Sequence, residues 1–309
     1  MDKPSQKSGF VNANGIKLHY LDWGGEGETL LFLAGMGCSI HIFDKFAPRF
    51  TDKFHVLAVD RRGHGDSDYP ETGYDADTLT EDLRQFLDAL KIDKVILAGH
   101  SLAYIELSRF SVLYPERVLK IIFLDAAYDN SSPEYKAMMG KNPLPKIIPA
   151  WPEDNFDTVE DYIATVKRLY PSLAVIWGEI MEEQTKHTLK TTAEGKVMDK
   201  MSEAEFKAIN DTIKSYEPEY AKIRAPILSF FAHQDGSAFL SSKYMTEEQK
   251  ALVIDFFKTV RQPYNKQYFE QFQRKVPHAK IMEIPNGHHY CFIKQEALVY
   301  EEMRKFLLE

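Results

Sequence analysis

The sequence has little of several features that mark whole classes of protein. It contains only two cysteines, Cys38 and Cys291, which excludes a disulfide framework and a zinc site built from clustered cysteines. It has no basic run, and its net charge of −8 disfavours nucleic acid or an anionic membrane as a partner. No apolar stretch approaches the roughly 20 residues that span a bilayer. We therefore expect no nucleic-acid partner and no membrane span.

The composition suits a folded α/β protein. The chain has 309 residues, of which 44% are hydrophobic and 13% aromatic, enough for one large domain with an insertion or for two ordinary domains. Residues 1–9 are polar and lack the apolar core of a signal peptide. We expect a cytoplasmic protein, although an exported protein whose signal peptide has been replaced by Met1 would begin in the same way.

Short apolar runs alternate with segments of helical spacing in most of the chain. The runs at 29–34, 54–60 and 95–98 have the length of buried strands, and apolar residues recur at helical spacing across 79–90. Strands that alternate with helices predict a parallel sheet covered by helices. The alternation stops from about 128 to 223, where the sequence is helical, charged and aromatic and shows no convincing strand.

This interruption predicts a helical cap inserted into an α/β core. We place the first part of the core at 1–127, the cap at 128–222 and the second part of the core at 223–309. Another long helical stretch is expected at 246–275, broken near Pro263 because proline removes a helix hydrogen bond. It lies between the predicted acid and the predicted base, so we expect it near the site.

The run from Val95 to Ala103 is VILAGHSLA, an apolar strand that ends at a serine and continues as a helix. A serine hydroxyl is a poor nucleophile at neutral pH, so it must be held at an exposed, tight turn where a histidine can take its proton. Gly99 leaves room for such a turn around Ser101. Ala103 stands where the pattern Gly-x-Ser-x-Gly has its second glycine, so an ordinary strand and helix remain an alternative on this run alone.

Three further segments, together with this turn, resemble the α/β-hydrolase fold family in the same order along the chain. LAGMG at 33–37 stands where the family has His-Gly and an oxyanion residue, and DRRGHGDS at 60–67 matches the loop after the family's fourth strand. Pro226 and Asp235 resemble the segment that presents the acid. The resemblance covers nearly the whole chain outside the cap. It implies an α/β fold with a mostly parallel central sheet, covering helices and an inserted helical cap.

A serine nucleophile needs a histidine base, and the base needs a carboxylate that fixes its tautomer and stabilises the imidazolium. The family uses the chain order Ser, Asp, His. We expect Ser101 as the nucleophile and Asp235 as the acid, because Asp235 follows a buried strand at 225–232. Asp125 follows the preceding strand and is the alternative acid, since some members of the fold place the acid there.

Two adjacent histidines compete for the role of base. His288 follows Gly287 directly and fits a simple Gly-His pattern. The family's last segment resembles Ile-Pro-Gly-x-Gly-His-aromatic, and counting four residues from Pro285 reaches His289, which Tyr290 follows as the aromatic residue. We therefore expect His289 as the base and keep His288 as the alternative.

The resemblance also implies an oxyanion hole made of two backbone N–H groups. One would come from Leu102, directly after the nucleophile, and the other from Met36 in the loop after the third strand. Arg62 and His64 belong to a family segment that holds loops together, so we expect a structural role for both. His100 is expected to pack within the turn rather than act as a second base.

A serine nucleophile disfavours epoxide hydrolysis and haloalkane dehalogenation, because close relatives with those activities require aspartate at this position. The expected reaction is cleavage of a carboxylic ester or lactone of a small, apolar substrate through an acyl-enzyme intermediate. The alternatives are a prolyl-aminopeptidase-like peptidase, a carbon–carbon bond hydrolase and, from another class, a ligand-binding receptor of the same fold without turnover. The chemistry requires neither a metal nor an organic cofactor, and we expect none.

Overall fold

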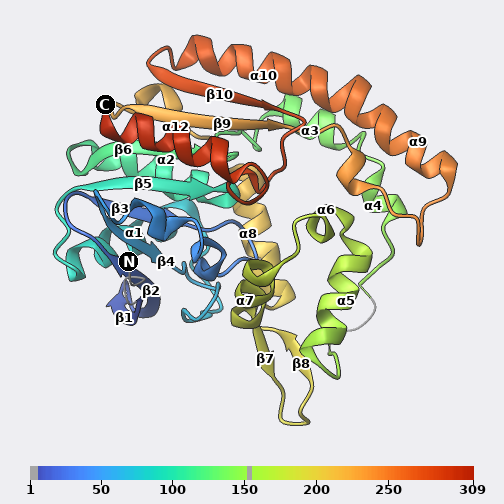
Figure 1. Ribbon diagram of the computed structural model, residues 1–309, viewed down its shortest axis with the longest axis horizontal. Coiled ribbons are helices and arrows are strands. Elements are labelled where there is room, and N and C mark those ends of the chain that lie inside the picture. The colour runs from blue at the N-terminus through green and yellow to red at the C-terminus, as the bar shows by residue number, and fades with distance from the viewer. Residues whose placement is uncertain (1–5, 152–154) are drawn as a thin grey trace.

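An eight-stranded sheet with the order β1-β2-β4-β3-β5-β6-β9-β10 forms the centre of the molecule (Figure 1). The computed structural model describes residues 6–151 and 155–309. Antiparallel pairing is confined to β1 with β2 and β2 with β4, and the other neighbours run parallel. The strands are β1 (Lys7–Ala13), β2 (Ile16–Gly24), β3 (Thr29–Leu33), β4 (His55–Val59), β5 (Val95–His100), β6 (Val118–Leu124), β9 (Ile227–His233) and β10 (Ala279–Pro285). The predicted mostly parallel sheet is confirmed.

Alternate residues of each central strand face two separate cores. In β3, Leu31 and Leu33 belong to one core, whereas Leu30 and Phe32 belong to the other. Residues of α1 (Ala76–Ala89) and α2 (Tyr104–Leu113) cover the first core, and residues of α12 (Glu296–Leu308) cover the second. Because helices cover both faces, every residue of β3 is buried, and all of them except Thr29 are apolar.

The segment between β6 and β9 leaves the sheet and gathers at the end towards which the parallel strands point (Figure 1). A short β-hairpin stands among its helices, so the expectation of no strand in this insertion is wrong. Each hairpin strand has only three residues, too few for an alternating pattern to be recognised in the sequence. The elements are α3 (Pro133–Met139), α4 (Leu144–Ile147), α5 (Val159–Leu169), α6 (Pro171–Ala174), α7 (Glu179–Thr188), β7 (Leu189–Thr191), β8 (Val197–Asp199) and α8 (Glu203–Ser215).

The helical stretch expected at 246–275 forms a long arm beside β10 that reaches over α3 and α4 (Figure 1). It consists of α9 (Glu247–Phe256), a π-helical turn at Phe257–Arg261 and α10 (Gln262–Lys275). Pro263 has no N–H, and its ring conflicts with the carbonyl of Thr259, which lies within that turn. The arm is therefore distorted but not interrupted near Pro263. The remaining helix, α11 (Cys291–Lys294), precedes α12.

No helix in the part of the chain that the structure describes is both long and apolar enough to cross a membrane. Among the described residues, the longest individual α-helices, α1 and α10, have 14 residues each, and the longer arm of α9, the π-helical turn and α10 contains charged residues along its length. A bilayer-spanning helix needs about 20 predominantly apolar residues.

Candidate active site

Ser101 occupies a left-handed backbone conformation at the end of β5, with φ of 51°. For a residue with a side chain this conformation costs roughly 1–2 kcal/mol, and such strained positions concentrate at functional sites. The turn places Ser101 at the carboxyl edge of the parallel strands, where its half-buried side chain lines a cavity. The backbone therefore has the form of the tight strand-to-helix turn that a serine nucleophile requires.

Two glycines allow the close packing around this turn. A Cβ atom on Gly99 would lie 2.6 Å from the Cβ of Ala103. Because Ala103 stands where the family motif has its second glycine, there is no space for a side chain at residue 99. A Cβ atom on Gly35 would lie 2.7 Å from Nδ1 of His100 and 3.1 Å from the Cβ of Ser101. The loop that contains Gly35 and Met36 is thus packed directly against the serine turn.

His289 is hydrogen-bonded to Asp125, and both residues line the same cavity as Ser101. Nδ1 of His289 lies 2.7 Å from Oδ2 of Asp125. The other carboxylate oxygen accepts the backbone N–H of Ala232 at 2.8 Å and the hydroxyl of Tyr128 at 3.0 Å. Asp125 is only 4% exposed, so these bonds hold its carboxylate in one orientation. The bond at Nδ1 leaves Nε2 of His289 as the proton acceptor, the tautomer that a serine base needs.

The expectation that Asp235 is the partner of the base is wrong in this structure. Its carboxylate accepts the backbone N–H of Ser237 at 2.9 Å and the Ser237 hydroxyl at 2.6 Å, and these bonds hold its pKa below the ordinary value. Asp235 lies two residues beyond the end of β9 and is turned back upon its own loop. Asp125, the alternative acid, directly follows β6 and reaches both β9 and the histidine loop.

Both ring nitrogens of His288 form hydrogen bonds to backbone groups and not to a carboxylate. Nε2 donates to the carbonyl of Ser172 at 2.8 Å, and Nδ1 accepts the backbone N–H of Tyr290 at 3.0 Å. Burial lowers the pKa of His288 below its ordinary value, which favours the neutral ring. His288 therefore connects the insertion to the histidine loop, and His289 is the histidine that has a carboxylate partner.

His100 and the loop at 60–67 have structural contacts. His100 is fully buried, its pKa is well below the ordinary value because of that burial, and its Nε2 donates to the carbonyl of His289 at 3.0 Å. Arg62 forms a two-pronged ion pair with Asp82, with both N···O distances at 2.6 Å. Burial lowers the pKa of His64 to about 3. These neutral histidines and paired charges support the loops around the cavity.

The cavity that Ser101 and His289 line has a volume of about 460 Å³. Its walls come from the carboxyl ends of the strands, from the insertion and from the arm formed by α9 and α10. The sequence did not single out Tyr128, which bonds to the acid, or Arg261, which ends the π-helical turn. Besides Ser101, Asp125 and His289, the lining includes Tyr104, Tyr128, Asn130, Tyr135, Met139, Asn142, Leu144, Tyr170, Ser172, Leu173, Gln234, Phe239, Phe256, Phe257, Arg261, His288 and Tyr290.

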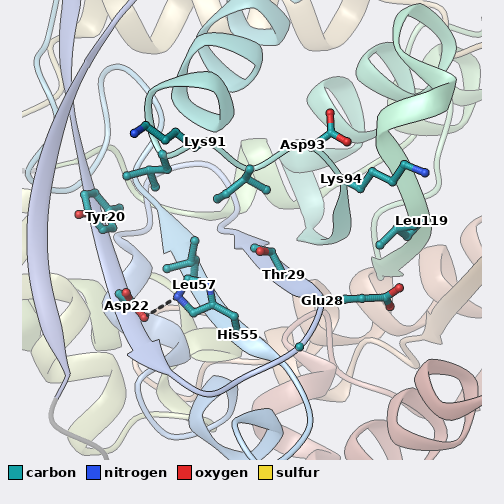
Figure 2. Close-up of a pocket in the computed structure, with 13 residues that line it drawn as sticks. Tyr20, Asp22, Glu28, Thr29, His55, Leu57, Lys91, Asp93, Lys94 and Leu119 are labelled. Carbon is teal, nitrogen blue, oxygen red and sulfur yellow. Dashed lines mark hydrogen bonds and ion pairs between the residues drawn. The ribbon is translucent and has the colours of Figure 1, made fainter.

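A second hollow lies at the opposite, amino ends of the parallel strands (Figure 2). Its lining includes Thr29 and His55, the first residues of β3 and β4, and His55 bonds to Asp22 at 3.1 Å. No serine or cysteine lines this hollow among the residues that the structure describes. Ligands of open α/β sheets bind at the carboxyl ends of the strands, so the cavity at Ser101 is the candidate active site.

One group of side chains outside the cavity has metal-ligand chemistry. Ligand-type atoms of His41, Asp66 and His187 lie within 4.8 Å of one another. The carboxylate of Asp66 already bonds to His187 at 2.5 Å and to the ammonium of Lys200 at 2.6 Å, and Nδ1 of His41 bonds to Asp44 at 2.8 Å. The ammonium competes with a cation for the same carboxylate. We therefore interpret the group as an ion-pair anchor between the insertion and the core.

Comparisons with known proteins find hydrolases among the similar sequences. The chain is 36% identical to 2-(acetamidomethylene)succinate hydrolase of Mesorhizobium japonicum over 101 residues, which is 33% of this chain and 36% of that relative. It is 24% identical to epoxide hydrolase 4 of Mus musculus over 301 residues, covering 93% of this chain and 79% of the relative. The first match thus spans only about a third of the relative's length.

Solved structures show the same fold over nearly the whole chain. A crystal structure of E-2-(acetamidomethylene)succinate hydrolase superposes with a TM-score of 0.73 at 21% identity, covering 98% of this chain and all of the other. A marine microorganism esterase superposes with a TM-score of 0.65 at 19% identity, covering 94% and 98% of the two chains. The family model for the alpha/beta hydrolase fold matches residues 28–249. The chain therefore belongs to the alpha/beta hydrolase fold family.

Proposed function

We propose that this protein is a serine hydrolase that cleaves a carboxylic ester or lactone. The observation that carries the proposal is the hydrogen-bonded pair of His289 and Asp125, which lines one cavity with Ser101 at its strained turn. A nucleophile, a base of fixed tautomer and a buried acid are the parts that acyl transfer needs. Asp125 replaces Asp235 as the proposed acid.

In the proposed mechanism, Nε2 of His289 takes the proton of the Ser101 hydroxyl as Oγ attacks the substrate carbonyl. The negative charge that develops on the carbonyl oxygen is held by the backbone N–H groups of Met36 and Leu102, and loss of one such donor typically costs about 10²–10³ in rate. His289 then protonates the leaving alkoxide. Asp125 stabilises the imidazolium throughout, and water releases the acyl group by the same steps.

The chemistry of residue 101 separates this proposal from the activities in the names of some relatives. Epoxide hydrolase 4 is among the matches, but the family resemblance implies that epoxide hydrolysis requires an aspartate at the nucleophile position. Here the residue is serine. An ester is favoured over an amide because an alkoxide leaves without the extra activation that an amine requires.

The lining of the cavity argues against an aminopeptidase. Holding a substrate amine requires a free acidic group, and Asp125 is the only acidic residue among the described lining residues. Its oxygens are occupied by His289, Tyr128 and Ala232. Glu179, Glu182 and Glu183, which belong to α7 of the insertion, do not line the cavity.

Hydrolysis of a short 4-nitrophenyl ester tests the proposal. We expect turnover by the wild-type protein and a loss of at least about 10³-fold in kcat/KM for Ser101→Ala. The matched control Ser215→Ala removes an exposed serine of α8 and should remain within about twofold of wild type. Full activity of Ser101→Ala would contradict the mechanism. Carbon–carbon bond cleavage without ester cleavage, or binding without turnover, would support the alternative functions.

A further inference from the structure

Arg261 introduces an unbalanced positive charge into the candidate active site. It ends the π-helical turn between α9 and α10 and lines the same cavity as Ser101 and His289. Histidines apart, Arg261 and Asp125 are the only charged residues among the described lining. Asp125 is already bonded to His289. The catalytic groups therefore supply no negative charge that balances the guanidinium of Arg261.

The guanidinium of Arg261 lacks the partners that buried arginines have elsewhere in this protein. Its Nε is buried without a hydrogen-bond partner among the described residues, and none of their carboxylates lies within 4.0 Å of it. Its polar neighbours include the sulfur of Met139, 3.7 Å from Nη1, and the Tyr135 hydroxyl, neither of which carries a negative charge. By contrast, buried Arg61 and Arg62 each form an ion pair with a buried carboxylate.

An unpaired guanidinium in a recess favours an anionic ligand. Removing such a group from water is costly unless its N–H groups and charge are satisfied. A carboxylate matches the planar fork of arginine and accepts two parallel N–H bonds, which makes this pair both strong and directional. The arginine is presented by a π-helical turn, a distortion that frequently occurs at functional sites.

We infer that Arg261 binds a carboxylate of the substrate. The substrate class is then an ester or lactone with a second, anionic end, separated from the reacting carbonyl by an apolar spacer that contacts Met139, Phe256 and Phe257. This inference rests on the proposed ester hydrolysis for the reacting end of the molecule. The sequence led us to expect an apolar substrate. The substrate inferred here has an apolar spacer but carries a negative charge at one end.

A pair of esters of equal chain length tests the inference. 4-Nitrophenyl hydrogen adipate ends in a carboxylate, and 4-nitrophenyl hexanoate ends in a methyl group. The wild-type protein should prefer the adipate in kcat/KM, and Arg261→Met should lower the adipate-to-hexanoate ratio by at least about 30-fold, the effect of removing one partner of a desolvated charge pair. Arg261→Lys should retain part of the preference. An unchanged ratio in Arg261→Met would overturn the inference.

The matched control is Arg274→Met, which removes an exposed arginine of α10, the helix that directly follows Arg261. Its adipate-to-hexanoate ratio should remain within about twofold of wild type. If Arg274→Met lowered the ratio as much as Arg261→Met, the preference for the adipate would come from the general positive charge of the surface. That result would also overturn the role of Arg261.

A binding measurement separates failure of this inference from failure of the proposed function and needs no variant to fold. By calorimetry the wild-type protein should bind adipamate, the monoamide of adipic acid, at least about tenfold more tightly than hexanamide. Equal affinities would overturn the inference even if esters are hydrolysed. If the wild-type protein cleaves neither ester, the proposed function fails, and the difference in affinity still decides whether the anion site exists.

Discussion

Asp125 and Asp235 follow neighbouring strands of one sheet, and their bonds decide which of them supports the base. Asp125 contacts three elements: the histidine loop through His289, β9 through Ala232 and the insertion through Tyr128. Asp235 contacts its own loop at Ser237. A carboxylate fixed by several elements can orient an imidazole, whereas one that caps a local turn cannot.

Substitution of each aspartate by asparagine tests this difference. We expect Asp125→Asn to lower kcat for a 4-nitrophenyl ester by about 10³–10⁴-fold, because an amide stabilises the wrong tautomer of His289. Asp235→Asn should remain within about threefold, since it loses only bonds to exposed Ser237. A severe loss in Asp235→Asn together with an active Asp125→Asn would restore the assignment made from the sequence.

The catalytic role of a residue could be predicted from the sequence where its neighbours along the chain form a distinctive motif. The serine turn was recognisable because a strand, a glycine and a helix surround Ser101, and the count from Pro285 preferred His289 to His288. The identity of the acid could not be predicted from neighbouring residues in the sequence. It depends on which strand end faces the histidine loop in space, and Asp125 and Asp235 both follow buried apolar strands. Arg261 was hidden for a similar reason, since only the folded structure shows that its Nε lacks a partner.

At the scale of elements, the insertion is anchored to the core by polar contacts. The side chain and backbone of Gln184 in α7 bond to Ser39, and both His187 of α7 and Lys200 bond to Asp66 of the core. Burial opposes the charging of His187, but the bond and the charge of Asp66 outweigh it and raise its pKa above the ordinary value of 6.5. The anchor therefore includes a pair whose strength depends on pH.

The pH dependence of this anchor has a definite sign. Because the folded-state pKa of His187 is raised, its stabilising contribution is complete below about pH 6.5 and is lost as the pH rises through the folded-state pKa. His187→Gln should therefore lower the free energy of unfolding more at pH 5.5 than at pH 8.5. The difference should be below about 1 kcal/mol, since the pair is partly exposed.

Urea unfolding at both pH values measures this effect. His278→Gln is the matched control, because His278 is exposed and lies outside the anchor. Its effect on the free energy of unfolding should be the same at both pH values to within about 0.5 kcal/mol. An equal loss of stability at both pH values in His187→Gln would show that shape, and not the charge on His187, matters at this contact.

At the scale of the whole molecule, the order of elements was predictable and the details of the insertion were not. Buried parallel strands are continuous apolar runs, and the glycine-rich loops that follow them are distinctive, so the core could be inferred from one sequence. The insertion packs its short elements against one another and against the arm of α9 and α10. The strands of its β-hairpin are too short to show an alternating pattern in the sequence. The π-helical turn depends on how the helix adjusts to Pro263, which hydrophobic periodicity does not reveal.

The cavity at Ser101 is formed by the core, the insertion and the arm together. The sheet places Ser101, Asp125 and the histidine loop at one edge, the insertion and the arm enclose that edge, and Arg261 supplies a charge at its wall. We propose that this arrangement makes Ser101 a reactive nucleophile.

Reaction with a fluorophosphonate, followed by mass spectrometry of the intact protein and its peptides, measures the reactivity of Ser101 itself. We expect one covalent adduct per chain, located on Ser101 and absent from Ser101→Ala. An unmodified wild-type protein, or an adduct on another residue that persists in Ser101→Ala, would show that Ser101 is not the nucleophile.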